Sequence, residues 1–181
     1  MNRGFSAKKE PRFEYISHPI LSTFFCTCCS VKRFPTQIYS QSKMDEAILY
    51  DPQVHSHLIP SLIAIHVACI TQPTYTIATF LPPLDQSVMQ NWWEDRAKEV
   101  ASGNRHIIMQ VATSLTTGKE EVAGVVMLDK PQSQTVPHTA WVEKLLVLPE
   151  WRRKGVTKRM MLKLEEIAKG EGRTLLVSLE L

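Results

Sequence analysis

The sequence predicts an α/β (α+β) fold in which helices flank a mixed, mostly antiparallel β-sheet. Apolar residues recur every three or four positions from Val54 to Ile70 and again from Arg153 to Lys169, which is typical of helices that bury one face. The segments Arg105 to Ser114 and Glu121 to Leu128 are rich in apolar and β-branched residues and are joined by a turn, which indicates an antiparallel hairpin. Between Trp141 and Leu179, the order of strand, loop, helix and strand completes the pattern.

The first half of this domain is predicted to contain a short strand followed by two helices. The strand covers Ala47 to Tyr50. In the first helix, Pro60 fits most easily if the helix begins just before it, because proline is tolerated in a first turn. The second helix is expected to begin at Asp85 and to end at Ser102 and Gly103, with glycine as the stop signal.

The second half is predicted to begin with the hairpin, whose turn is Thr116 to Lys119. A further strand is expected over Trp141 to Leu148, and the last one over Thr174 to Leu179. The helix between them stacks four apolar residues on one face, namely Val156, Met160, Leu164 and Ile167.

Composition indicates one globular domain with room for an extension, since 44% of the 181 residues are hydrophobic and 22% are charged. We predict a domain over residues 44–181 and a disordered or targeting extension over residues 1–43. The extension has seven Lys and Arg residues against Glu10 and Glu14 and contains several Ser and Thr, in part like a mitochondrial leader. We expect a cytoplasmic protein, with a mitochondrial location as the alternative if residues 1–43 are a leader.

The cysteines and the apolar runs point away from metal sites and membrane spans. Three cysteines cluster at Cys26, Cys28 and Cys29, and Cys69 stands apart. Because no spaced second pair completes a zinc site or a disulfide framework, we predict free thiols and no metal. The apolar run from Leu58 to Ile70 is too short to span a bilayer, so no membrane partner is expected.

Positive charge is concentrated on the loop that leads into the last helix. Residues 142–164 hold seven Lys and Arg residues against two Glu, which favours a local anion site over a diffuse nucleic-acid surface. Gly155 lacks a Cβ, so a ligand can approach the backbone closely, and the first amides of the helix have no intrahelical acceptor. A diphosphate at this helix N-terminus would accept those N–H bonds. The alternative is a solvated basic helix cap. Neither a Walker loop nor a G-x-G-x-x-G fingerprint is present.

This segment resembles motif A of the GNAT superfamily, the acyl-CoA-dependent N-acetyltransferases. The family pattern is a V-x-P strand end followed by [QR]-x-x-G-x-[GA]; here these stand as Val147-Leu148-Pro149 and Arg152 to Thr157. Thr157 takes a place where Gly or Ala is usual, and Arg153 replaces a frequent Gly. The resemblance covers roughly residues 45–181 and is strongest from 121 to 177.

The resemblance implies an enzyme that moves an acetyl group from acetyl-CoA to a primary amine of a small molecule by direct attack on the thioester. Backbone amides of the loop would hold the coenzyme A pyrophosphate, and the preceding strand would pair with the pantetheine arm and polarise the thioester carbonyl. The cofactor-binding residues implied in this way are Leu146, Val147, Leu148, Arg152, Arg153, Lys154, Gly155, Val156, Thr157 and Lys158.

Glu143 is the candidate general base, since it lies four residues before Val147 on the strand that would line the acyl site. The alternative is a strand carboxylate paired with a neighbouring cation. Simple strand alternation puts Glu143, Leu145 and Val147 on one face of the sheet. A bulge in this strand, which is common in the family, would change that arrangement.

Family members continue beyond the strand that matches Thr174 to Leu179 into a helix and two further strands, and that helix often supplies a Tyr that protonates the leaving thiolate. This sequence stops at Leu181, so we expect a C-terminally incomplete domain with an open sheet edge at that strand. A second hypothesis is therefore a non-catalytic coenzyme A-binding remnant. A third, an RNA-binding module on Arg152 to Lys154, is disfavoured because no aromatic residues are interleaved there. The sequence leaves the oligomeric state open.

Three aromatic positions of the two first helices are assigned to packing. His66 lies beside the apolar stripe and is expected in the core or at its rim. The adjacent Trp92 and Trp93 point to different sides of a helix, so one is predicted in the core. The resemblance offers the entrance for the acceptor as an alternative place for the other.

Overall fold

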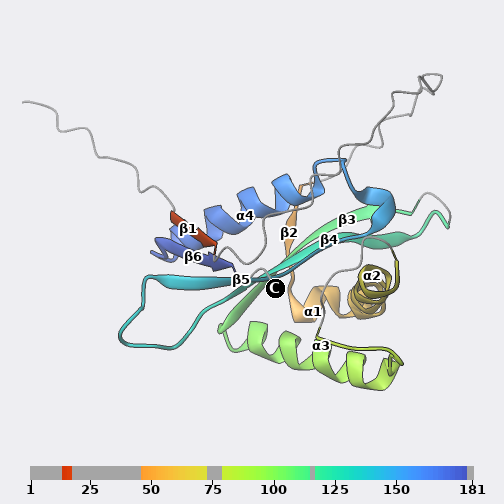
Figure 1. Cartoon of the computed structure of the whole chain (residues 1–181), viewed down its shortest axis with the longest axis horizontal. Helices are drawn as coiled ribbons and strands as arrows, with labels where there is room; N and C mark the ends of the chain where they lie inside the picture. Colours follow the sequence, from red (N-terminus) through yellow and green to blue (C-terminus); the bar gives the residue numbers. More distant parts are fainter. Residues whose placement is uncertain (1–13, 18–45, 73–78, 115–116, 179–181) are drawn as a thin grey trace, which may run out of the picture.

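The computed structural model describes residues 14–17, 46–72, 79–114 and 117–178 (Figure 1). The rest of the predicted extension with its three cysteines, part of the loop before Asp85, Thr116 of the hairpin turn and Leu179 lie outside the described residues. In chain order the elements are β1 (Glu14–Ser17), β2 (Ile48–Leu49), α1 (Pro52–His55), η1 (Ser56–Leu58), α2 (Ile59–Thr71), α3 (Gln86–Ala101), β3 (Arg105–Thr113), β4 (Glu120–Asp129), β5 (Thr139–Val147), η2 (Pro149–Trp151), α4 (Val156–Gly170) and β6 (Leu175–Ser178).

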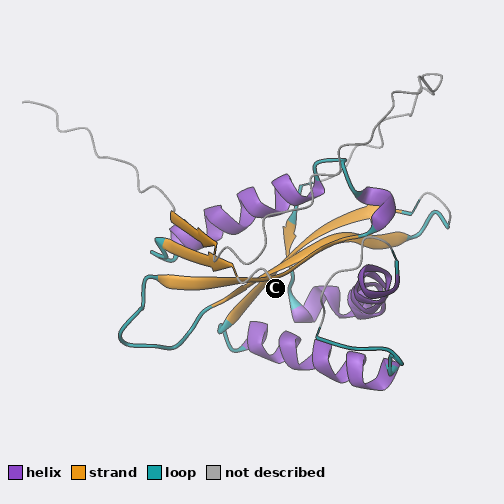
Figure 2. Ribbon diagram, viewed as in Figure 1, coloured by secondary structure: helices purple, strands orange, loops and turns teal. Residues whose placement is uncertain are grey.

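One six-stranded sheet organises these elements, in the order β1-β6-β5-β4-β3-β2. The pairs from β2 to β5 are antiparallel, whereas β6 runs parallel to both β5 and β1. Figure 2 shows α4 on one face of the sheet and α1 to α3 on the other. The prediction of a mixed, mostly antiparallel sheet flanked by helices is therefore confirmed, and so is the β3–β4 hairpin.

The central strands are buried on both faces because helices cover each side. In β3 the residues from Ile107 to Met109 are fully buried, and in β4 every side chain from Val122 to Leu128 is fully buried. Such strands carry continuous apolar runs in place of alternating ones. The core thus lies in two layers, one under α4 and one under α2 and α3.

The predicted helix boundaries are confirmed where local signals set them. Helix α2 begins at Ile59 with Pro60 in its first turn, where a missing N–H costs nothing. Helix α3 begins after Asp85, whose carboxylate accepts bonds from the amides of Ser87 and Val88. Capping and proline chemistry therefore locate both starts.

One stripe of the apolar first helical region belongs to the core. The continuous helical stretch from Pro52 to Thr71 is longer than the apolar run seen in the sequence, and by length and composition alone it could cross a membrane. Its stripe of Leu62, Ile65 and Cys69 is almost fully buried against the sheet. That packing is the arrangement of a core helix in a folded domain.

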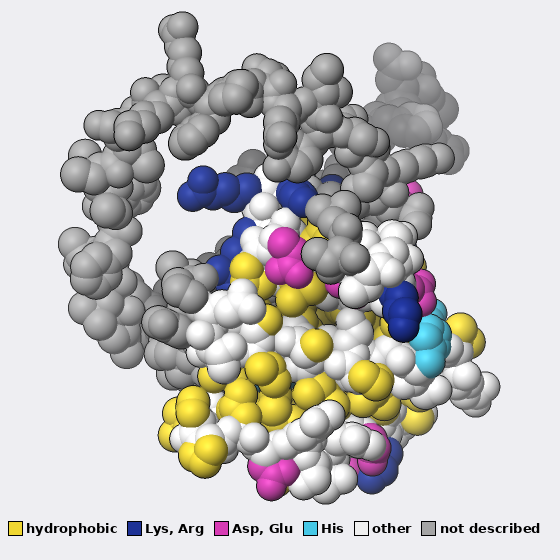
Figure 3. All heavy atoms as spheres, turned by 90° about the vertical axis from the view of Figure 1, so that its right-hand side faces the viewer, with side chains coloured by type: hydrophobic (Ala, Val, Ile, Leu, Met, Phe, Trp, Pro, Cys, Tyr) yellow, Lys and Arg dark blue, Asp and Glu magenta, His cyan; other side chains and the backbone are white. Residues whose placement is uncertain are grey.

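Part of the surface of α2 remains uncovered. A groove of about 500 Å³ runs between α2 and the start of α3, and Figure 3 shows hydrophobic side chains gathered on the lower half of this side of the molecule. The residues that line the groove are Pro60, Ile63, Ala64, Val67, Ala68, Thr71, Gln72, Leu84, Gln86 and Met89.

The expected open edge at the last strand is wrong. In the structure Glu14–Ser17 pairs in parallel with Leu175–Ser178, so β1 covers the edge of β6. These four residues also correct the expectation that the whole extension lacks structure. The error has a simple reason, because a strand of four residues shows no usable period in the sequence, and its partner lies almost a chain length away. The domain boundary at residue 44 stays a prediction.

Helix α4 begins at Val156, three residues later than predicted. Arg153 and Gly155 both adopt positive φ, at 61° and 76°, so the helix cannot start before them. Its first turns pack closely on β4 at Gly124, where a Cβ would lie 2.5 Å from Cγ1 of Val156 and 2.8 Å from Cε of Met160. This close approach fixes the start of α4 against the sheet.

Candidate functional site

A cavity of about 390 Å³ lies where the β5–α4 loop enters the helix. The loop leaves β5 at Val147, passes through η2 and ends at Gly155, the residue before α4. The cavity is lined by Val147, Trp151, Arg152, Arg153, Gly155, Val156, Thr157 and Lys158. Seven of the ten predicted cofactor-binding residues are therefore brought together around one space.

The electrostatics of this cavity suit an anion. Gly155 precedes α4 without a side-chain cap, so the first amides of the helix have no such acceptor in the described part of the chain. The 15-residue helix points its positive end toward the cavity. Arg152, Arg153 and Lys158 add three cations to the lining. A diphosphate fits the donors, the dipole and the charge together.

Three predicted residues do not line the cavity. Leu146 and Leu148 are buried among the core side chains, so only their backbone groups can serve a ligand. The amine of Lys154 lies 4.5 Å from the ring centre of Trp151, and not among the lining groups.

Trp151 is a member of the site that sequence reasoning missed. Its ring is almost fully buried, and its Nε1–H donates to Oε1 of Glu121 on β4 at 2.8 Å. This bond ties the turn of the loop to the sheet. The available signal was an aromatic residue between Pro149 and Arg152, where an exposed loop would normally carry a polar one.

The edge of β5 next to the cavity presents backbone groups. In the described residues β6 pairs with β5 only over Thr139 to Val142, so the later part of β5 has no strand on that side. The amide of Leu148 donates to β4, and alternation directs the peptide groups of Val147 to the other edge. The Val147 carbonyl there accepts from Nε of Arg152 at 3.3 Å and from Sγ of Cys69 at 3.6 Å. Burial raises the pKa of the Cys69 thiol, which keeps it a donor.

A β-bulge in β5 decides which side chains share a face. Lys144 has φ of 53°, and the β4–β5 register shifts at this point. Glu143 and Leu146 now oppose Met127 and Val125, two residues apart on β4, so they share a face. Val147 lies on the other face, and the predicted alternation of Glu143 with Val147 is corrected.

The carboxylate of Glu143 pairs with a buried arginine. Nη1 of Arg105 donates to Oε2 of Glu143 at 2.8 Å, while Nε and Nη2 bind Glu99 at 2.6 Å and Asp129 at 3.0 Å. The Arg105 side chain is only 7% exposed, whereas that of Glu143 is 41% exposed. The cation pairing that was the alternative hypothesis for Glu143 is therefore present. Only Oε2 of Glu143 is used by Arg105.

Burial and charge act in opposite directions within this cluster. Burial raises the pKa of Asp129 above its ordinary value, and the Arg105 guanidinium only partly offsets this. Burial on its own would lower the pKa of Arg105. The hydrogen bonds to Glu143 and Glu99 outweigh burial, so the pKa of Arg105 is raised above its ordinary value. The guanidinium stays charged and holds three carboxylates in place. The described residues contain no group of three or more His, Cys, Asp or Glu side chains placed to hold a metal ion.

His66 lies at the centre of an aromatic cluster between α2 and α3. Its ring centre is 5.1 Å from that of Phe80, 5.7 Å from that of Trp92 and 5.9 Å from that of Trp93. His66 is fully buried, which confirms the predicted core position, and neither ring nitrogen has a partner among the described residues. Trp93 is buried, which confirms one core position in the pair, and Trp92 is half-buried against the core, while a place at the acceptor entrance stays a prediction. Burial and then the nearby Lys144 lower the pKa of His66 to about 4.

This buried histidine predicts acid sensitivity. Because its pKa falls from 6.5 in the unfolded chain to about 4 in the fold, the unfolded state binds more protons between these values. The stability that neutral His66 contributes is fully present above pH 6.5 and is lost as the pH falls from 6.5 toward 4. We expect the free energy of unfolding to drop by about 2 kcal/mol between pH 7.5 and pH 5 on this account.

Urea unfolding at both pH values tests the expectation. His66→Phe, which keeps an aromatic ring in the cluster, should lose this part of the pH dependence. The exposed His57 provides the matched control, because His57→Gln should follow the unsubstituted protein. An unchanged pH slope in His66→Phe would contradict the assignment.

Comparisons with known proteins agree with this geometry. The model of the acetyltransferase (GNAT) family matches residues 70–180. Similar solved structures include an N-acetyltransferase from Staphylococcus aureus Mu50, with 18% identity, a TM-score of 0.52 and coverage of 74% of this chain and 73% of that one. A Trypanosoma brucei acetyltransferase has 17% identity, a TM-score of 0.50 and coverage of 74% and 82%.

A third similar structure is an aminoglycoside acetyltransferase from an uncultured soil metagenomic sample, with 14% identity, a TM-score of 0.50 and coverage of 74% and 75%. A search of curated proteins finds no match. At these identities the solved structures show a shared fold, while the family match spans the strands, the basic loop and α4 that form the cavity.

Proposed function

The chain belongs to the acetyltransferase (GNAT) family, and from this premise we propose that it transfers an acetyl group from acetyl-CoA to a primary amine of a small molecule. The observation that carries the proposal is the cavity at the start of α4. It combines first-turn amides, a helix N-terminus and the cations Arg152, Arg153 and Lys158 around one space. That arrangement matches the diphosphate of coenzyme A.

The proposed cofactor lies along two neighbouring parts of the site. Amides from Arg153 to Lys158 hold the pyrophosphate, and the side chains of the cavity supply counter-charge. The pantetheine arm pairs with the edge of β5 that β6 leaves unpaired, beside the outward-facing peptide groups of Val147. This arm is a chain of amides, so it can exchange hydrogen bonds with a strand edge.

The proposed reaction needs little beyond positioning. The amine nitrogen attacks the thioester carbonyl carbon, a C–N bond forms, the C–S bond breaks, and coenzyme A leaves as a thiolate that takes up a proton. An N–H group of β5 polarises the carbonyl oxygen. The protein therefore holds the donor in place and accepts one proton from the amine.

Glu143 is the proposed acceptor of that proton. Arg105 holds Oε2 of the carboxylate, and Oε1 has no hydrogen-bond partner among the described residues, so it can accept from the amine directly or through a water. We expect Glu143→Gln to lower kcat/KM by about 100-fold and to remove the acidic limb of its pH profile. Asp129→Asn is the matched control, because Asp129 also binds Arg105. Asp129 pairs with Trp141, so it lies further along the sheet from Val147 than Glu143 does. Equal effects of both substitutions on the pH profile would contradict a base at Glu143.

A small-molecule acceptor is supported by one similar structure, whose name describes it as an aminoglycoside acetyltransferase. The concentration of cations in one cavity, and not across a surface, also favours a compact ligand over RNA.

Calorimetry and thiol release test the proposal in two steps. Acetyl-CoA is titrated into the full chain, and release of free thiol is then followed across a panel of primary amines that includes aminoglycosides and aliphatic diamines. Binding with amine-dependent release is the expected result. Binding without release from any amine would leave a coenzyme A-binding protein and contradict the catalytic part. No binding of acetyl-CoA would overturn the whole proposal.

A further inference from the structure

The loop that lines the cavity contains a peptide group whose orientation is not fixed by the chain alone. Lys154 stands between two residues with positive φ, Arg153 at 61° and Gly155 at 76°. The peptide unit between Lys154 and Gly155 can rotate by half a turn at small cost, because glycine accepts positive and negative φ alike. Its direction therefore needs an external contact.

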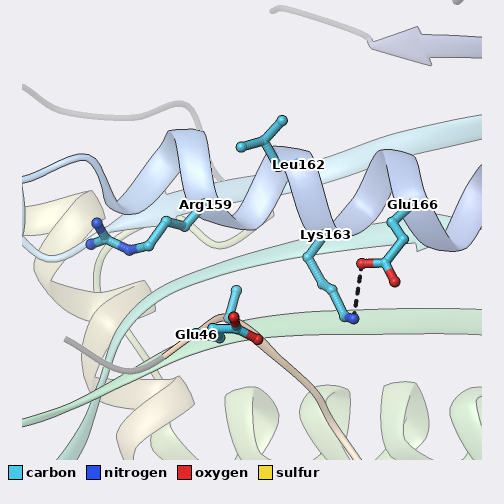
Figure 4. A pocket seen from close by; sticks show the side chains of 6 residues that line it. Glu46, Arg159, Leu162, Lys163 and Glu166 are labelled. Carbon is cyan, nitrogen blue, oxygen red and sulfur yellow. Dashed lines mark hydrogen bonds and ion pairs between the residues drawn. The ribbon is translucent and has the colours of Figure 1, made fainter.

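Arg159 supplies that contact from the first turn of α4. Its Nη2 donates to the carbonyl of Lys154 at 3.2 Å, and its Nε donates to Oε1 of Gln110 at 3.0 Å. Figure 4 shows the Arg159 side chain running toward the start of the helix, whereas Lys163 on the same helix turns to Glu166. The guanidinium thus joins the loop to the sheet.

The sheet end of this link is rigid. Gln110 is fully buried on β3, at the register shift between Gln110 and Val111. Its side-chain amide donates to the Val111 carbonyl at 3.1 Å, which leaves the side-chain oxygen directed at Arg159. A guanidinium that binds a buried, oriented oxygen has few alternative positions.

The carbonyl that Arg159 holds determines where an amide points. In a planar trans peptide the C=O and the N–H point in opposite directions, so a Lys154 carbonyl turned to Arg159 turns the N–H of Gly155 away from it. Gly155 lines the cavity together with Val156 and Thr157, whereas Lys154 does not, so we take the N–H of Gly155 as the end of this peptide that faces the cavity. With the peptide reversed, a carbonyl oxygen would face the anion there.

We propose that Arg159 is a positioning residue that locks the Lys154–Gly155 peptide so that the Gly155 N–H faces the bound pyrophosphate. The inference rests on the proposed use of coenzyme A. It assigns Arg159 a role through the backbone, not through direct contact with the ligand. A positive charge at position 159 is therefore not enough to hold the peptide. The planar fork of arginine is required, because it binds both the loop and Gln110.

The test compares coenzyme A binding by calorimetry in Arg159→Lys, Arg159→Met and Lys163→Met. We expect both Arg159 variants to bind about 10- to 100-fold more weakly, as for a lost hydrogen bond to a charged group. Lys163→Met removes one positive charge from the same helix without touching the loop, and its affinity should stay within about twofold.

A second measurement separates orientation from folding. The chain has seven glycines, so labelling with ¹⁵N-glycine gives a simple amide spectrum. Coenzyme A should shift the Gly155 amide strongly in the unsubstituted protein and weakly in Arg159→Lys, while the Gly124 amide under α4 keeps its position in both. Full affinity in Arg159→Lys, or an undiminished Gly155 shift, would overturn the inference. An unsubstituted protein that does not bind coenzyme A would instead overturn the proposed function.

Discussion

Replacing Gly155 by valine is expected to abolish measurable coenzyme A binding while the fold persists. Gly155 has φ of 76°, a conformation that costs a β-branched residue about 1–3 kcal/mol, so the loop must move to relieve it. A Cβ here would also stand 3.4 Å from Nη1 of Arg159 and would project from the backbone that a pyrophosphate must approach. Calorimetry with coenzyme A and thermal unfolding without it measure the two effects separately.

Gly103 provides a matched control for backbone strain. It has the same φ of 76°, and a Cβ there would meet nothing within 4 Å. Gly103→Val should therefore lose a similar amount of stability and keep its affinity for coenzyme A. If the two variants lose affinity equally, strain and not the site explains the result. If Gly155→Val binds normally, the cavity at the start of α4 is not the coenzyme site.

Arg105→Met is expected to destabilise the protein more than any other substitution that breaks an ion pair of the described residues. Removal of the guanidinium leaves the carboxylates of Glu99, Asp129 and Glu143 close together without their shared cation. Breaking a buried pair from one side costs about 3–5 kcal/mol, and the partial exposure of these carboxylates places the expected loss near the lower value, at about 3 kcal/mol. Urea unfolding at pH 7 measures it.

The pH dependence of this loss follows from the sign of the repulsion. Without Arg105 nothing offsets the neighbouring carboxylates, which raise the pKa of Asp129, so the folded state binds a proton there more readily. The deficit of Arg105→Met should therefore shrink as the pH falls toward 4. Arg96→Met, which removes only one partner of Glu99, should cost about 1 kcal/mol or less at pH 7. A deficit that is small at pH 7, or that grows on acidification, would contradict the cluster.

Local chemistry made much of the fold and of the cavity at the start of α4 predictable. The stripe of α4 and the β3–β4 hairpin follow from residue spacing, and the start of α3 follows from the capping carboxylate of Asp85. The cavity was foreseeable for the same reason, because its lining residues are neighbours in the chain from Val147 to Lys158. A glycine just before an amphipathic helix can be recognised from the local sequence alone.

Contacts between distant segments could not be predicted in this way. Arg105 meets Glu143 only because β3, β4 and β5 lie side by side, and no spacing rule selects one Arg from many. The bulge at Lys144 reverses the face of Glu143 although nothing in the local sequence demands a positive φ. The link from Arg159 to Gln110 likewise depends on how closely α4 packs on the sheet at Gly124.

The strand that covers β6 has a consequence for the order in which the protein is made. Glu14–Ser17 leaves the ribosome before every other described element, and its partner Leu175–Ser178 leaves after all of them. Strand pairs so far apart in the chain form late, because the long loop must close before the contact stabilises anything. During synthesis the hairpin of β3 and β4 can pack against α2 and α3 before β6, the partner of β1, has been made. Pairing of β1 with β6 is therefore expected to follow the assembly of the other described strands.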